Sequence, residues 1–387
     1  RISEQTTWNN LNLLDGTYTG KVFQVGFKGA ETIDVTIDDA ATDAIGAFNI
    51  HSEGFTSSLS TASKTNVTAD ALDISGYLGS ARVSFNTDNT DYNTSVKATA
   101  ARINAVKDAT GVEATAITKA RLHDVSASGV IQFNLGANHD DTSVAMTRYA
   151  VTATLSTEAD LDPLVDAINK HAANTGVTAK LGATAAEIIL THQKGENIDL
   201  TRIMVGGLSS GTFKLDTLDK FGNAVTTADT TLNRGTSAGG AATTFTVSDA
   251  AANRRAYVMG TMTLSSIKNF TVAGDNAGLG AGYFDTVQNH TGQTTSGGTA
   301  KLSTVASISV ATQEHASDAI AVLDAAIAKI DQQRADLGAI SNRLSSVVDN
   351  NTSMVTNTES SKSHILDTDF AVETTKLTRT QILQQAA

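Results

Sequence analysis

The chain has 387 residues, of which 40% are hydrophobic and 18% are charged, and this length suffices for two or three domains with separate cores. Its 28 Lys and Arg side chains against 40 Asp and Glu give a net charge of −12, which disfavours binding to nucleic acid and to anionic membranes. The absence of cysteine excludes disulfides, zinc–thiolate sites and a cysteine nucleophile. No run approaches the roughly 18 apolar residues of a membrane helix.

The first 50 residues indicate a short loop followed by a β-hairpin. Phe23, Val25 and Phe27 alternate with polar residues, and residues 32–37 alternate in the same way after a turn at residues 28–30. This alternation predicts two strands with one buried face.

An internal repeat lies within residues 80–205. Two apolar helical patches begin with Ile-Asn and end in Thr-Gly-Val: Ile103-Asn104 with Thr110-Gly111-Val112, and Ile168-Asn169 with Thr175-Gly176-Val177. The offset is the same at both ends (168 − 103 = 65 and 175 − 110 = 65). Each glycine is expected to take the left-handed conformation just past a helix, and each valine to start a strand. We expect two related helix-plus-sheet modules that arose by duplication, with further strands around Ile131 and Ile188.

Residues 206–300 are rich in Gly, Thr and Ser. Short alternating segments predict strands at residues 212–215, 244–247, 257–264 and 270–273. Residues 290–300 have the composition of a linker.

The last 72 residues (316–387) have the pattern of a coiled coil. With Ile320 as position a of a heptad, the a and d positions hold Ile320, Leu323, Ile327, Ile330, Leu337, Leu344, Val348 and Val355. Arg334, Ser341 and Asn351 are polar residues at the same positions, and about five heptads give a helix of roughly 60 Å. A second helix is expected to start after a cap at residues 367–369 and to continue through residues 381–385. Since such an apolar stripe requires a partner, the pattern predicts an assembly protein.

Catalytic patterns are missing from the sequence. Glu314-His315 lacks the second histidine of a zinc protease, and His139-Asp140-Asp141 lacks the spacing of a calcium loop and is interpreted as a solvated turn. We therefore expect no enzyme, no catalytic, metal or cofactor-binding residues, and no cofactor. Arg254 and Arg255 beside Tyr257 are candidates for contact with an acidic glycan, and a solvated turn is the alternative.

Both ends of the chain resemble bacterial flagellins, over about the first 45 and the last 85 residues. The resemblance is carried by four segments: residues 1–16, 336–344 (Asp-Leu-Gly-Ala-Ile-Ser-Asn-Arg-Leu), 365–373 (Ile-Leu-Asp-Thr-Asp-Phe-Ala-Val-Glu) and 379–386 (Arg-Thr-Gln-Ile-Leu-Gln-Gln-Ala). Trp8 and Asn10 stand where the family usually has Phe and Gly. The resemblance implies a core fragment without the N-terminal helices and the last C-terminal helix of the family.

The resemblance further implies a self-assembling structural subunit of the extracellular flagellar filament, on the bacterial flagellum or cell surface, that serves motility. Its expected partners are further copies of the subunit, an export chaperone and hook-associated proteins, without nucleic acid or membrane insertion. The candidate assembly residues are Ile320, Leu323, Ile327, Ile330, Arg334, Leu337, Asn342, Arg343, Leu344, Gln381, Ile382 and Leu383. The alternative is a surface adhesin on the same scaffold that binds polysaccharide through Arg254, Arg255 and Tyr257.

The expected fold is a multi-domain α+β protein, with an elongated helical rod and outer β-rich domains built partly from the duplicated modules. The rod domain comprises residues 1–48 and 301–387, and includes the hairpin and the coiled-coil-like helix. Outer module 1 covers residues 49–150, module 2 covers residues 151–205, and a β-rich return segment covers residues 206–300.

Overall fold

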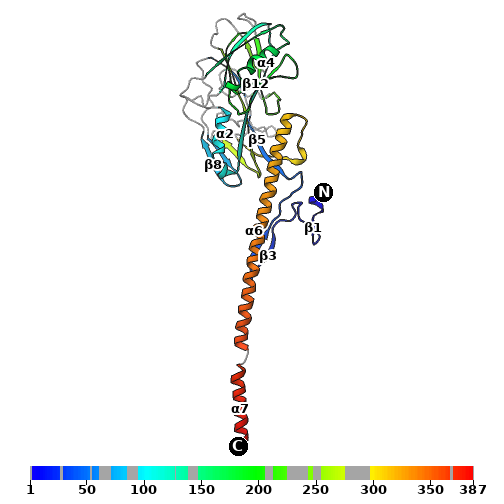
Figure 1. Cartoon of the computed structure of the whole chain (residues 1–387), viewed down its shortest axis with the longest axis vertical. Coiled ribbons are helices and arrows are strands. Elements are labelled where there is room, and N and C mark those ends of the chain that lie inside the picture. Colours follow the sequence, from blue (N-terminus) through cyan, green and yellow to red (C-terminus); the bar gives the residue numbers. More distant parts are fainter. Residues whose placement is uncertain are drawn as a thin grey trace. The chain divides into compact units, whose positions relative to one another are not determined.

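The structure is a computed structural model that describes residues 2–26, 29–52, 55–60, 71–84, 95–126, 128–137, 147–204, 212–224, 243–246, 254–274, 297–366 and 369–386. It is of mixed α+β class, with several antiparallel sheets and a long C-terminal helix (Figure 1). The chain divides into two compact units. Unit 1 comprises Arg1–Ile45 and Ile327–Ala387, and unit 2 comprises Gly46–Ala326. The four domain ranges expected from the sequence stay predictions.

Unit 1 combines two small hairpins with helical segments. Its elements are α1 (Ile2–Gln5), β1 (Thr7–Trp8), β2 (Leu11–Asn12), β3 (Lys21–Gln24), β4 (Thr32–Val35), the larger part of α6 (Gln313–Leu366) and α7 (Phe370–Ala386). The expected hairpin is formed by β3 and β4, with Phe23 opposite Ile33. On β4, Ile33 and Val35 are buried on either side of the exposed Asp34, as the alternation predicts. Phe27 lies outside the described residues.

The β1–β2 hairpin turns through two asparagines. Asn9 and Asn10 have φ angles of 49° and 60°, and Trp8 pairs with Leu11 across them. A two-residue hairpin turn of this kind needs left-handed backbone at both central positions, and asparagine tolerates that conformation better than other non-glycine residues. Asn10 can therefore replace the glycine that is usual in the family at this turn.

Replacing Asn10 by glycine should stabilise unit 1 by up to about 1 kcal/mol, because glycine has no Cβ to oppose a φ of 60°. Urea unfolding followed by the fluorescence of Trp8, the single tryptophan of the chain, measures the change next to the turn. Asn10→Ala serves as the comparison and should shift the midpoint in the opposite direction. A lower midpoint for Asn10→Gly would contradict the proposed turn.

Unit 2 contains most of the strands. They are β5 (Gly46–His51), β6 (Phe55–Ser60), β7 (Ala71–Ser75), β8 (Ser80–Ser84), β9 (Glu113–His123), β10 (Gly129–Gly136), β11 (Tyr149–Leu155), β12 (Val177–Leu181), β13 (Ile188–His192), β14 (Ile198–Met204), β15 (Thr212–Leu218), β16 (Thr243–Thr246), β17 (Arg254–Met259), β18 (Thr261–Ser266), β19 (Thr271–Gly274), β20 (Gly297–Thr299) and β21 (Lys301–Thr304). The helices are α2 (Val96–Asn104), α3 (Lys107–Thr110), α4 (Asp162–Asn169), α5 (Ala172–Thr175), the one-turn η1 (Val305–Ser307) and the start of α6.

Three sheets organise these strands. Their orders are β11-β10-β14-β17-β6, β20-β19-β7-β8, and β12-β13-β9-β18-β5-β21 with β15 between β9 and β16. Two sequence expectations are corrected here. The predicted strand at residues 257–264 is two strands, β17 and β18, which separate at Gly260 and join different sheets. The predicted linker at residues 290–300 ends in β20, which pairs with β19.

The two Ile-Asn segments have the same local structure. Each Ile-Asn pair ends a helix, α2 or α4, and a one-turn helix follows, whereas we expected the pair to begin the helical patch. After each one-turn helix, Gly111 (φ 72°) and Gly176 (φ 70°) take the predicted left-handed conformation.

Each asparagine holds the strand that follows it. The Asn104 side-chain amide donates to Ala114 O at 2.8 Å, and its Oδ1 accepts from Ala114 N at 2.8 Å. Asn169 makes the same pair of bonds with Ala179, at 2.9 and 2.8 Å. The two segments thus share a hydrogen-bonding pattern as well as a sequence pattern.

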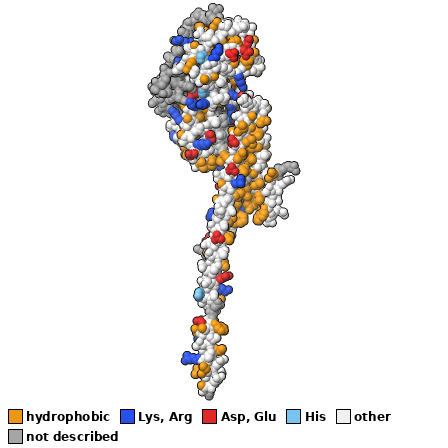
Figure 2. All heavy atoms as spheres, in the orientation of Figure 1, with side chains coloured by type: hydrophobic (Ala, Val, Ile, Leu, Met, Phe, Trp, Pro, Cys, Tyr) orange, Lys and Arg blue, Asp and Glu red, His pale blue; other side chains and the backbone are white. Residues whose placement is uncertain are grey.

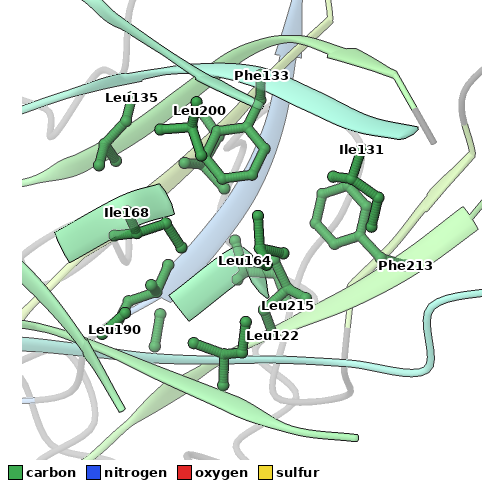
Figure 3. Close-up of a cluster of buried hydrophobic side chains, with 14 of the residues drawn as sticks. Leu122, Ile131, Phe133, Leu135, Leu164, Ile168, Leu190, Leu200, Phe213 and Leu215 are labelled. Atoms are coloured by element: carbon green, nitrogen blue, oxygen red, sulfur yellow. The ribbon is translucent and has the colours of Figure 1, made fainter. Parts of the chain in front are cut away.

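The repeated helices pack in separate cores of unit 2. Leu164 and Ile168 of α4 lie among side chains of the surrounding strands, including Phe133 and Leu200 (Figure 3). Ile103 of α2 belongs to a second cluster, with residues of β5, β7, β8 and β18. Each helix therefore stabilises a different part of unit 2, at about 1.5–3 kcal/mol for each fully buried aliphatic side chain.

Candidate assembly surface

One face of α6 is used inside unit 1. Leu337, Ile340, Leu344 and Val347 pack against the hairpin core, which includes Ile33. In the heptad numbering these four residues occupy d and g positions, alternating along the helix. Leu337 and Leu344, two of the candidate assembly residues, are thus covered by the chain's own hairpin.

Three polar side chains of α6 fix the same face to the N-terminal segment. Lys329 Nζ donates to Ala44 O, Gln333 Nε2 to Asp38 O and Asn351 Nδ2 to Val25 O, each at 3.0 Å. Asn351, a polar d position in the sequence pattern, is therefore a docking contact within the chain. Side chains that satisfy main-chain carbonyls in this way fix the register of the helix on the hairpin.

The a positions of α6 stay uncovered. Ile320, Ile327, Val348 and Val355 are 61%, 59%, 62% and 56% exposed. Leu323, at a d position before the hairpin contact begins, is also exposed. We call Ile320, Ile327, Val348 and Val355 the a-stripe. Aliphatic side chains aligned along one helix face gain free energy by burial, which fits a surface for association.

Polar residues interrupt the a-stripe at its centre. Arg334 occupies an a position with its side chain 79% exposed, and its guanidinium lies 3.8 Å from Asp331. Ser341, the next a position, is also exposed. Polar groups at a positions weaken packing but specify register.

Helix α7 buries none of its residues. Its exposed large side chains are Phe370, Val372, Leu377, Ile382 and Leu383. Figure 2 shows hydrophobic side chains at the surface of this segment, between polar ones. Asp369 caps the helix as expected, since its Oδ1 accepts from Ala371 N at 3.0 Å. Helices in proteins gain most of their stability from packing, and α7 buries no residue within the described structure.

The remaining candidates fall into three groups. Asn342, Arg343 and Gln381 are exposed on α6 and α7, and Ile330 of α6 is half-buried. Arg254, Arg255 and Tyr257 belong to β17, but their side chains lie outside the described part of the structure, as do His139, Asp140 and Asp141. Within the described ranges, no three His, Asp or Glu side chains gather as metal ligands, and no helix combines the length and hydropathy of a membrane span.

Two features escaped the sequence reasoning. Ile340 and Val347, at g positions, complete the face that contacts the hairpin. The sequence shows their spacing of seven residues, but an assignment of contacts to a and d positions places g positions outside the contact face.

Comparisons with known proteins match both the C-terminal helical segment and part of unit 2. Residues 320–387 match the family described as bacterial flagellin C-terminal helical region, and residues 132–192 match the flagellin hook IN motif. The chain is 29% identical to the B-type flagellin of Pseudomonas aeruginosa over 386 residues, which cover 100% of this chain and 70% of that protein. It is 49% identical to flagellin A of Vibrio cholerae over 90 residues, which cover 23% of this chain and 24% of that protein.

Among solved structures, the flagellar cap protein FliD of Helicobacter pylori aligns with 66% of this chain and 83% of its own, at 11% identity and a TM-score of 0.18. Such a score is too low to support a shared architecture.

These sequence matches point to a class of self-assembling structural proteins. The sequence matches are to bacterial flagellins, a family of structural proteins and not of enzymes. The resemblance noted at both ends of the sequence is confirmed, and the glycan-binding adhesin has no support from the comparisons.

Proposed function

We propose that this chain is a structural subunit of the extracellular flagellar filament and associates with other copies through the a-stripe of α6 and the apolar side chains of α7. The observation that carries the proposal is that one face of α6 packs on the hairpin and another face is exposed. From Leu337 to Val347 its apolar d and g side chains pack on the hairpin core, whereas the apolar side chains at its a positions are exposed. The a-stripe is thus available to a partner without any disruption of unit 1.

The exposed polar residues of α6 support the same role. Arg334 at an a position would cost free energy if it were buried unpaired, so it favours a partner helix that places a carboxylate opposite it. This restricts the registers in which two helices can pack, as an ordered filament requires.

Polymerisation of the full-length protein, followed by light scattering and electron microscopy, tests the proposal. Wild-type protein should form filaments, and deletion of residues 348–387 should prevent them while the sheets of unit 2 keep their circular dichroism signal. Filaments from the deletion protein, or a wild-type protein that stays monomeric under all assembly conditions, would overturn the proposal.

Two further partners are part of the proposal. Because α7 buries none of its side chains, an export chaperone would have apolar surface to cover before assembly. A hook-associated protein is supported by the match of residues 132–192 to the hook IN motif.

The two Ile-Asn segments are further proposed to be duplicated modules. The support is their offset of 65 residues (169 − 104) and their identical asparagine hydrogen bonds. The hook IN match includes Asn169 and excludes Asn104, so segment 96–114 would be a diverged second copy.

A further inference from the structure

The loop after β15 lies against the first turns of α6, and both belong to unit 2. Residues 219–223 form a compact turn around the Asp219 carboxylate, which accepts hydrogen bonds from Phe221 N at 2.9 Å and Asn223 N at 2.8 Å. Gly222 completes the turn with a φ of 90°. The loop is therefore held in shape by its own hydrogen bonds. We call residues 219–223 the strap.

The strap contacts α6 through a charge and through a ring. Lys220 Nζ makes a short hydrogen bond with Asp318 Oδ1. Phe221 stacks on His315, with ring centroids 4.8 Å apart and an interplanar angle of 22°. His315 is in turn bonded to Thr312, which caps the helix by accepting from His315 N at 3.2 Å. The strap thus holds the capped first turn and the second turn of α6.

A buried lysine joins the strap, the sheet and the helix. Lys119 of β9 donates through Nζ to Lys220 O at 2.8 Å, and the same Nζ lies 3.3 Å from Glu314 Oε1. Lys180 of β12 lies 3.4 Å from the same Glu314 oxygen. A lysine with only 6% of its side chain exposed requires such partners, because a buried charge is costly when unpaired.

Apolar contacts add little at this end of the helix. The buried residues of α6 are Ala319, Val322 and Ala326, of which the first follows the strap contact. The turns at residues 313–318 are therefore held to unit 2 mainly by ion pairs, hydrogen bonds and one ring stack. Such contacts are screened by salt and lost in acid, unlike the sheet cores.

We infer that residues 219–223 are a releasable strap that locks the first two turns of α6 onto unit 2, and that these turns can open while the sheets stay folded. The strap contacts the part of α6 that belongs to unit 2, before the helix passes into unit 1 at Ile327.

Acid should weaken the region around the strap in two stages. The pKa of His51 of β5 is lowered to about 4, first by desolvation and then by the charge of Lys220, while the charges of Asp318 and Asp219 oppose the shift. Protonated His51 is disfavoured in the folded state, in part because its charge repels that of Lys220. The loss of folded-state stability therefore grows as the pH falls from 6.5 toward 4.

The second stage belongs to Glu314. Its pKa is lowered from 4.5 to about 2, first by a hydrogen bond from its own backbone N–H and then by Lys119 and Lys180, while desolvation opposes the shift. A lowered carboxyl pKa contributes stability above pH 4.5 that is lost as the pH falls toward 2. Asp318, which faces Lys220, and His315, which faces Phe221, are the other titratable groups of α6 at the strap.

Hydrogen exchange of the whole chain, read by mass spectrometry, tests the inference. In Lys220→Met/Phe221→Ala, the amides of residues 317–323 should exchange at least about tenfold faster than in wild type, and the amides of β13 and β14 should not change. The matched control is Lys107→Met, which removes an exposed ion pair to Glu113 elsewhere in unit 2 and should change neither set.

Gly222→Ala provides a second variant that keeps every charge. A side chain at a φ of 90° strains the turn although there is open space around it, so residues 317–323 should again exchange faster. Unchanged exchange of these amides in both variants would overturn the inference. Equal acceleration in β13 and β14 would overturn it as well, because the helix would then open only with the whole unit.

Discussion

Replacing Val348 and Val355 by aspartate should abolish filament formation and leave the folded chain as stable as before. Both side chains are more than half exposed in the chain and lie one heptad apart at a positions of α6. Packing against a partner helix would bury two unpaired carboxylates, which costs several kcal/mol. The critical concentration for assembly should therefore rise by at least about a hundredfold, since 1.4 kcal/mol corresponds to a factor of ten.

The matched control introduces the same charges on another face. Ser346 and Ser353 are exposed f positions with the same spacing of seven residues, and Ser346→Asp/Ser353→Asp should assemble much like wild type. Leu344→Asp is the opposite comparison, because Leu344 packs on the hairpin core and its replacement should destabilise unit 1. Sedimentation after seeded growth gives the critical concentration, and the fluorescence of Trp8 gives the stability of unit 1.

The outcome distinguishes two uses of one helix. Normal assembly of Val348→Asp/Val355→Asp would show that the a-stripe is not a contact between subunits. Failure of the serine control would show that added charge on α6 blocks assembly irrespective of the face.

The sequence predicted the long helix and its need for a partner, but not which face the chain itself covers. Hydrophobic periodicity predicts that Leu337 and Leu344 pack against a partner. It does not report that this partner is a hairpin about 300 residues earlier, because no local property of α6 encodes the approach of residues 13–37. Asn351 is an example, because its polar side chain at a d position is explained only by the hydrogen bond that it donates to Val25 O.

The predicted strand boundaries in residues 206–300 were wrong where the local sequence pattern and the sheet pairing differ. Residues 257–264 were predicted as one strand, yet the chain changes sheets at Gly260, where a Cβ would lie 2.3 Å from Ile117 O. Only a glycine allows this approach, and a lone glycine in a strand pattern is the available signal. The strap could not be predicted from the sequence, because Lys220 and Asp318 are 98 residues apart in the chain.

The Ile-Asn repeat was recognised from its spacing, but its physical role needed the structure. β12 is the edge strand of its sheet, and the side chain of Asn169 bonds both the N–H and the C=O of Ala179, as a residue of a neighbouring strand would. Ala114 lies on β9 beyond the residues paired with β13, and there Asn104 occupies the open side. Both asparagines therefore satisfy main-chain groups that no described strand pairs with.

Asn169→Ala should accordingly destabilise unit 2 by about 2–6 kcal/mol, because it leaves a buried N–H and a buried C=O of Ala179 without partners, at about 1–3 kcal/mol each. Asn169→Asp should be no milder, since a carboxylate can accept from Ala179 N but cannot donate to Ala179 O. Urea unfolding followed by the β-sheet signal in circular dichroism measures both.

The control and the parallel variant separate a general helix effect from the loss of the edge contact. Asn174→Ala, at an exposed position of α5, should change stability by less than about 0.5 kcal/mol. Asn104→Ala should reproduce the loss in the other core, where Ala114 is equally buried. If Asn169→Ala cost no more than Asn174→Ala, the bonds to Ala179 would not stabilise the edge. Equal and large losses at Asn104 and Asn169 would instead mean that the same side chain performs the same task 65 residues apart (169 − 104).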